Sequence, residues 1–176
     1  MPDAIAETAF GVCELWLNRC LTGLEACPGL APITDSYVAA GAIAWDSCCG
    51  LLVAAPERIY RTADFPIEGT TDYVCESSFL TVDVLVLLLR CVPVIDDRGK
   101  APASAVMNEA YRAVIQDAAI IWNEMVGELP EGWSRANVDQ AFVGAAGGCV
   151  GVETRMTIGL GQSYWCPPCL NPLGSG

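Results

Sequence analysis

The sharpest chemical motif in the sequence is a pair of cysteines close to its end, in the stretch YWCPPC at 164–169. A WCxxC sequence resembles the thioredoxin active site, which needs its first cysteine at a helix N-terminus, where the helix dipole lowers the thiol pKa. Only seven residues follow Cys169, and Pro172 and two glycines among them prevent a helix. The motif is therefore better explained by a Cys166–Cys169 disulfide or by plain thiols than by redox catalysis.

The other cysteines raise the question of metal binding and disulfides. The ten cysteines lie at positions 13, 20, 27, 48, 49, 75, 91, 149, 166 and 169. The N-terminus lacks the basic region and the uninterrupted apolar region of a secretory signal, so we expect a protein made in a cytoplasm. Disulfides are rare there, and most cysteines, including Cys75, Cys91 and Cys149, are predicted to be thiols that pack as small hydrophobes. The seven-residue spacing of Cys13, Cys20 and Cys27 is not the short spacing of zinc sites, so no metal site is predicted.

The remaining residues give little support for catalysis. There is no histidine, which removes the commonest general base and the commonest metal ligand. The pair Asp96–Asp97 lies in a turn beside a glycine, where carboxylates are usually solvated, and the glycines at 144–148 lack a Walker lysine. No nucleophile is paired with a base. We therefore expect no enzyme and no catalytic, cofactor-binding or metal-binding residues.

The charge balance excludes one class of function. The chain has 21 acidic and 9 basic residues, a net charge of −12. A protein that grips nucleic acid needs a basic stripe to displace counterions, and none is present. An acidic surface is typical of simple solubility, and it also suits a protein past which DNA must slide without sticking.

The element most clearly predicted is a long central strand within Val74–Ile95. Its even positions Leu80, Val82, Val84, Val86 and Leu88 are apolar, while its odd positions begin polar and become apolar from Leu85. This is the two-residue period of a strand, although a buried helix is the alternative. The uninterrupted apolar run Val84–Leu89 is too short to cross a membrane.

The rest of the chain supplies elements that would pack on this strand. The apolar spacing predicts a helix at about 4–24 capped by Asp3, and a second at about 105–126 capped by Ser104. Strands are predicted at 48–60 and 142–160, and a weak one near Ile43 and Trp45. The fold class is therefore α+β: a sheet of about four mainly antiparallel strands packed against two helices. Residues 1–161 form one domain, and residues 162–176 form a Pro/Cys-containing tail.

A polar segment, Arg61–Asp72, separates two of these strands and is long for a hairpin tip. It predicts an extended β-hairpin arm with exposed backbone, which a neighbouring subunit could pair with. Opposite charges gather there, and they make the candidate subunit interface: Arg58, Arg61, Asp64, Glu68 and Asp72.

This order of elements resembles the tail-terminator proteins of long-tailed bacteriophages. The residues that carry the likeness are ERIYRTADFP at 57–66, FLTVDVLVLLLRCVPV at 79–94, MNEAYRAVIQDAAIIWNEM at 107–125 and GGCVGVETRMTIGL at 147–160. The resemblance covers roughly 4–24 and 48–160 and rests on element order and general pattern. The chain departs from the family in its number of cysteines and in its Pro/Cys tail.

The resemblance implies a virion protein of the neck, made in the host cytoplasm. It implies self-association in a ring, with a homohexamer as the expected form, that caps the tail tube and meets the head-completion proteins. Phage DNA would pass through the lumen without specific binding. Another head–tail connector component, a stopper or an adaptor, is the close alternative, and a cysteine-based metal or redox module is the alternative from a different class.

Overall fold

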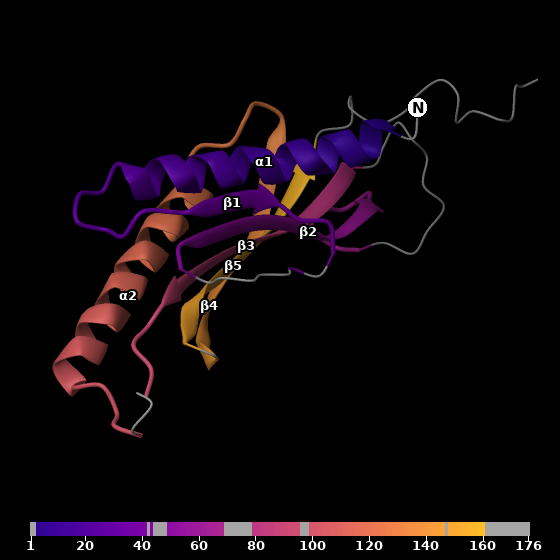
Figure 1. Cartoon of the computed structure of the whole chain (residues 1–176). Helices are drawn as coiled ribbons and strands as arrows, with labels where there is room; N and C mark the ends of the chain where they lie inside the picture. Colours follow the sequence, from indigo (N-terminus) through magenta and orange to yellow (C-terminus); the bar gives the residue numbers. More distant parts are fainter. Residues whose placement is uncertain are drawn as a thin grey trace, which may run out of the picture.

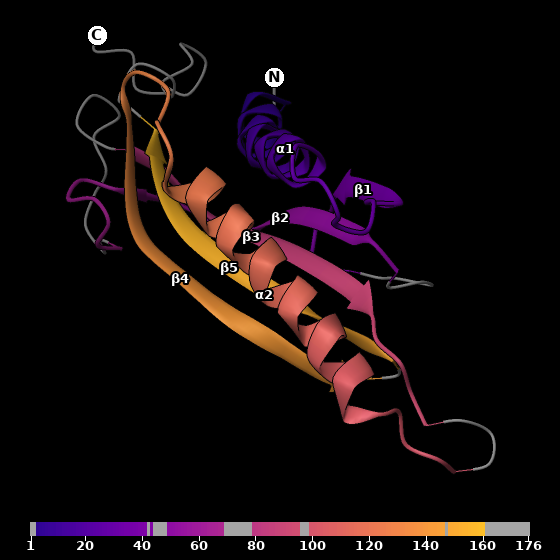
Figure 2. The same cartoon turned by 90° about the vertical axis from the view of Figure 1, so that its left-hand side faces the viewer.

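The computed structural model describes residues 3–41, 43, 49–68, 79–95, 99–146 and 148–160, and for residues 3–7, 145 and 146 the backbone only. Two helices and five strands follow one another in the order α1 Asp3–Glu25, β1 Asp35–Val38, β2 Leu51–Thr62, β3 Phe79–Cys91, α2 Ser104–Val126, β4 Trp133–Ala146 and β5 Cys149–Leu160. The strands form one sheet in the order β1-β2-β3-β5-β4. Both helices lie on the same face of it (Figures 1 and 2). The predicted α+β class is confirmed, with one strand more than expected.

The strand β3 is the centre of the sheet, as its sequence predicts. It pairs antiparallel with β2 on one side and with β5 on the other. Its even side chains, from Leu80 to Leu88, are buried in one cluster with residues of both helices. Its odd side chains Leu87 and Leu89 belong to a separate buried cluster with β2 residues on the opposite face. The two-residue period therefore divides the core into a helix-covered face and a far face. The predicted residues 74–78 lie outside the described part, and 92–95 continue without strand structure.

The helix α1 covers the β2 side of the sheet. The predicted stripe is confirmed where side chains are described, because Ala9, Val12, Cys13, Trp16, Cys20 and Leu24 are all buried. The predicted cap is wrong, since Asp3 is itself the first helical residue. The expectation that Gly23 ends the helix early is also wrong. A Cβ at Gly23 would come within 2.8 Å of the Glu124 side chain on α2, so this glycine permits the close approach of the two helices.

The helix α2 covers the β5 and β4 side of the sheet (Figure 2). Val114, Ala118, Ile121 and Met125 are buried as predicted. Tyr111, expected on the same stripe, is exposed, and Met107 is half-buried. Ser104 is the first helical residue rather than the cap, because Ala103 takes the capping position and makes no side-chain hydrogen bond there.

The largest error of the sequence prediction concerns the last third of the chain. One strand was expected at 142–160 after a loop, but β4 and β5 form a hairpin that turns at Gly148, whose φ is +82°. Polar residues of β4 bind α2, which explains why this strand resembles a loop in sequence. Arg135 donates to the carbonyls of Met125 and Gly127 at 2.9 and 2.8 Å, where α2 ends. Gln140 donates to the Ala118 carbonyl at 2.9 Å.

The other end of the sheet is also shifted from its prediction. The strand β1 lies at Asp35–Val38 and runs parallel to β2, whereas the weak strand was expected near Ile43 and Trp45. Ile43 is not in a strand, and Trp45 lies outside the described residues. The strand β2 begins at Leu51 and extends two residues past the predicted end, with an irregularity in its pairing after Pro56. Because β1 pairs with Leu51–Ala54 and no other described strand lies on this side of β2, Pro56 is at an edge where its missing N–H costs no ladder bond to a described strand.

Candidate functional site

The described part of the predicted arm, residues 61–68, ends β2 and then forms a compact turn that folds back on this strand. The Tyr60 hydroxyl donates to the Pro66 carbonyl at 3.2 Å, and the Thr62 hydroxyl donates to the Ile67 carbonyl. The Phe65 and Phe79 rings are 6.3 Å apart, and a Cβ at Gly159 would meet the Phe65 ring. Residues 69–78 lie outside the described part, so the extended form of the arm stays a prediction.

The charged residues predicted for the subunit interface lie partly together. Arg58 bridges Glu68 at 3.0 Å and Asp83 at 2.7 Å. The hydrogen bond that Arg58 donates to Asp83 raises the pKa of the Arg58 guanidinium. Asp64 stands at the start of the compact turn, where its carbonyl accepts from the Ile67 N–H at 2.7 Å. Arg61 is half-buried on β2, and Asp72 lies outside the described residues. The structure thus groups Arg58 and Glu68 within one chain and adds Asp83, which the sequence prediction missed.

A ladder of charged side chains continues across the far face of the sheet. The Thr157 hydroxyl donates to Asp83 at 2.7 Å. Arg155 on β5 bridges Glu57 at 3.1 Å and Glu153 at 2.8 Å. Burial opposes the positive charge of Arg155, but the two carboxylates outweigh it and raise the pKa of the guanidinium.

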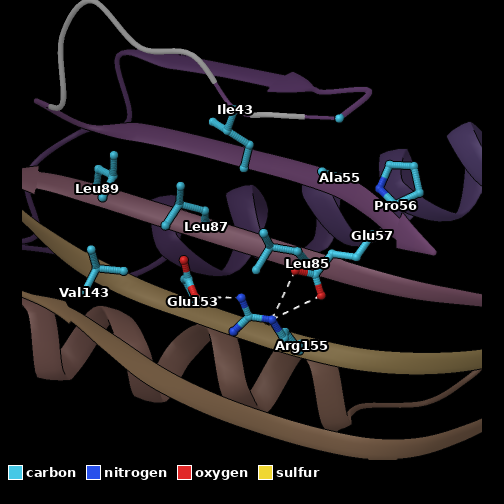
Figure 3. A pocket seen from close by; sticks show the side chains of 11 residues that line it. Ile43, Ala55, Pro56, Glu57, Leu85, Leu87, Leu89, Val143, Glu153 and Arg155 are labelled. Atoms are coloured by element: carbon cyan, nitrogen blue, oxygen red, sulfur yellow. Dashed lines mark hydrogen bonds and ion pairs between the residues drawn. The ribbon is translucent and has the colours of Figure 1, made fainter.

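Beside this ladder the far face contains a cavity of about 460 Å³ that is lined by both apolar and charged side chains. Its floor is formed by Leu85, Leu87 and Leu89 of β3, with Ile43 above them and Val143 at one side (Figure 3). The Arg155 ion pairs lie at the other end of the cavity, and the helices lie behind the sheet in this view. The cavity therefore opens on the side that no described helix covers.

In the part of the chain that the structure describes, both edges of the sheet lack a pairing strand over part of their length. The strand β4 is the outermost strand on one side. On the other side β1 pairs with the first four residues of β2, and no other described strand pairs with the outer edge of β2 from Ala55 onward. Tyr111 and Ile115 of α2 and Phe142 of β4 are exposed apolar side chains that line a cavity of about 350 Å³. None of the described residues in the wall of this cavity is charged. On the β2 side, Ile59 is exposed.

The cysteines correct a prediction. Cys49 and Cys91 form a disulfide, with their Cα atoms 4.7 Å apart, and Cys149 is also disulfide-bonded. The prediction that Cys91 and Cys149 are thiols is therefore wrong. The sequence contained a signal for the pair, because an antiparallel hairpin places the start of one strand opposite the end of the next, and cysteines lie at both places. Cys75, Cys166 and Cys169 are outside the described residues, so the Cys166–Cys169 disulfide stays a prediction.

The helix cysteines behave as predicted. Cys13 and Cys20 are free and buried within α1. Burial raises the pKa of each thiol to about 12, so both are protonated and unreactive at neutral pH.

Within the described ranges, no group of three or more carboxylates and cysteines is arranged to hold a metal ion. In the same part of the chain, neither helix is long and apolar enough to cross a membrane. No protein-family model matches the sequence, and no curated protein matches it either.

Proposed function

We propose that this protein is a tail-terminator-like subunit of a bacteriophage neck. In this proposal the chains form a ring, a homohexamer, that caps the tail tube and joins it to the head-completion proteins. The protein is then a structural component of the virion rather than an enzyme, and it needs no cofactor.

The observation that carries the proposal is that, among the described residues, one sheet has two different edges without a pairing strand. The outer edge of β4 and the outer edge of β2 beyond Ala54 both offer unpaired backbone groups to another strand. Because the edges differ in sequence, pairing one with the other joins subunits head to tail, and head-to-tail contacts close into a ring when the rotation allows it.

Exposed apolar side chains support contact at the same two edges. Phe142 stands opposite Val152 in the β4–β5 register, and Ile59 stands opposite Val82 in the β2–β3 register. Val152 and Val82 both belong to the helix-covered cluster. Phe142 and Ile59 therefore lie on the same side of the sheet, so that edge pairing would bring apolar surface of one subunit toward apolar surface of the next.

The charge of the chain supports DNA passage through such a ring. A net charge of −12 repels phosphate, which favours sliding over binding. The same surfaces would serve a stopper or an adaptor, so the position of the protein in the particle distinguishes these neck components. Electron microscopy of intact virions with a tag on this chain measures that position.

The edge contact is tested with Phe142→Lys in a complementation assay that scores joining of tails to heads. Phe142 is 60% exposed, so the variant is expected to fold, with a Tm within a few degrees of the parent. The lysine adds charge to the apolar edge, and tails should remain unjoined. The matched control is Val106→Lys, an exposed apolar residue of α2 that does not line the β4 cavity.

The arm is tested separately by replacing residues 63–70 with a short Gly/Ser turn. The shortened chain should fold but fail to join heads and tails. Normal infectious particles from either variant would contradict the corresponding contact, and virions that lack the protein altogether would contradict the neck assignment.

A further inference from the structure

Three cysteines lie side by side at one end of the far face. In the β2–β3 register Leu51 faces Leu89, so Cys49 and Cys91 face each other two residues further on, beyond the end of the ladder. In the β3–β5 register Cys91 faces Cys149 directly. The arrangement allows the Cys49–Cys91 bond to form. Facing residues without mutual hydrogen bonds have Cα atoms about 4.5 Å apart, close to the 4.7 Å between the Cα atoms of Cys49 and Cys91.

The Cys49–Cys91 bond joins the start of β2 to the end of β3, and an ion pair fixes the same part of the molecule. We call this part of the molecule the corner. The residue before Cys91, Arg90, points to the opposite face, where it binds Asp117 of α2 at 2.9 Å and the Pro32 carbonyl at 3.0 Å. On the other strand, Gly50 accepts at its carbonyl from the N–H of Thr34 at 2.8 Å. The end of β3 is thus tied to α2, to the segment before β1 and, covalently, to the start of β2.

Such a bond does not fit a protein that stays in a reducing cytoplasm. Disulfides persist in oxidising environments, and cytosolic thiols are kept reduced by glutathione and thioredoxin. A virion protein experiences both conditions, because it is assembled inside the cell and then released. Cys91 is exposed in the described chain, so a soluble disulfide can reach it.

We propose that Cys49 and Cys91 are an oxidation site: their disulfide forms after the particle is released from the cell, and it then ties the end of β3 covalently to the start of β2. The inference rests on the proposed neck function, because it needs a protein that leaves the cytoplasm. Inside the cell both residues are thiols, and the corner is held by the Arg90 contacts and the β2–β3 ladder. Outside it, oxidation adds the covalent tie.

The reaction is an ordinary thiol–disulfide exchange. The Cys91 thiol loses its proton to water, and the resulting thiolate attacks one sulfur of a soluble disulfide such as oxidised glutathione and releases one glutathione thiolate. The Cys49 thiol then loses its proton to water, and its thiolate attacks the Cys91 sulfur of the mixed disulfide, which forms the Cys49–Cys91 bond and releases the second glutathione thiolate. Two protein thiols are oxidised by two electrons, and one glutathione disulfide is reduced to two thiols.

The timing is tested by trapping thiols with an alkylating reagent in two samples. One is particles assembled in cells and alkylated at lysis, and the other is released virions. Mass spectrometry then measures the oxidised fraction of Cys49 and Cys91. We expect the ratio of oxidised to reduced pair to rise by at least about tenfold on release. The peptides with Cys13 and Cys20 are the internal control and should be thiols in both samples. An equal ratio in the two samples would overturn the proposal.

The covalent tie is tested on the purified full chain. Dithiothreitol should lower the Tm of the parent by about 5 °C or more. Cys49→Ser/Cys91→Ser should have a lower Tm without the reagent and a smaller response to it than the parent, because among the described cysteines only the disulfide of Cys149 remains to be reduced. The matched control Cys27→Ser removes a free cysteine and should keep the full response. A parent Tm that does not respond to reductant would overturn the covalent tie. If released virions lack the protein, the neck function is refuted. The response of the purified chain to reductant does not depend on that result and still tests the disulfide.

Discussion

The two faces of β3 are built from the same kinds of residue and yet differ in what covers them. On the helix-covered face, Val82, Val84 and Val86 are fully buried beneath α1 and α2. On the far face, Leu85 and Leu87 are also buried, but they form the floor of a cavity of about 460 Å³. The difference shows that a two-residue period predicts on which side a side chain lies, and not what packs against it.

Charged residues and cysteines follow the same division. The helix-covered face holds a buried bidentate ion pair, Arg90 with Asp117, and the free thiols of Cys13 and Cys20. The far face holds the partly exposed Arg155 ladder and the Cys49–Cys91 disulfide. Each face thus holds an arginine–carboxylate ion pair and cysteines, buried on the helix-covered face and partly exposed to water on the far face. The same substitution can therefore be made on both faces and the effects compared.

The largest expected effect is that of a carboxylate placed in the helix-covered face. Val84→Asp buries a charge among both helices without a partner, a cost that should exceed the whole free energy of unfolding. The variant should therefore be insoluble or unfolded. Expression, solubility and circular dichroism measure this directly.

The matched change on the far face is Leu85→Asp, one residue along the same strand. Its side chain lines the open cavity, beside Arg155, so water and a guanidinium can reach the new carboxylate. We expect a soluble protein with a lowered Tm. A cooperatively melting Val84→Asp protein, or equal effects at the two positions, would contradict the division into faces.

A smaller effect is expected for Arg90→Met, which removes one partner of the buried ion pair. Asp117 is then left buried and uncompensated, at a cost of about 3–5 kcal/mol in the free energy of unfolding. The second substitution Asp117→Leu should restore much of this loss, because it removes the stranded charge. Urea denaturation of the two variants measures both numbers. No recovery in the double variant would mean that the hydrogen bond from Arg90 to Pro32 carries the stability.

Local patterns predicted the central strand and both buried helix stripes, because apolar period depends on residues close in sequence. The same patterns failed at β4, since the polar side chains of Arg135 and Gln140 are satisfied by carbonyls of α2 that no local window contains. The charge partner Asp83 was missed for a similar reason. It is 25 residues from Arg58 in sequence, and only the β2–β3 register brings the two together.

A pH dependence should follow from the thiols of the helix-covered face. Burial raises the pKa of Cys13 and Cys20 from 9.0 to about 12. Above pH 9 the unfolded chain therefore loses protons that the folded chain keeps, so the free energy of unfolding falls as pH rises from 9 toward 12. The slope approaches about 1.4 kcal/mol per thiol for each pH unit. Denaturation at pH 8 and pH 10 measures the fall.

The control for this prediction is the double variant Cys13→Ala/Cys20→Ala. It should be less stable at pH 8 because two buried sulfur atoms are lost, but its free energy of unfolding should change less between pH 8 and pH 10. An unchanged slope would show that other groups, such as tyrosines, cause the loss of stability at high pH.

The smallest effect is expected for Arg155→Met, the same substitution as Arg90→Met but on the far face. The ion pairs of Arg155 with Glu57 and Glu153 are about one-third exposed, so water and salt already screen them. When Arg155 is lost, the two carboxylates remain hydrated, whereas Asp117 is stranded when Arg90 is lost. The change in the free energy of unfolding should therefore be at most about 1 kcal/mol. It should be smaller still at about 0.5 M salt, a few times the physiological ionic strength.

Equal losses of stability from the two Arg→Met variants would mean that the far face is as dry as the helix-covered one. That result would point to another surface covering the cavity in solution, and ultracentrifugation of the parent would then show self-association.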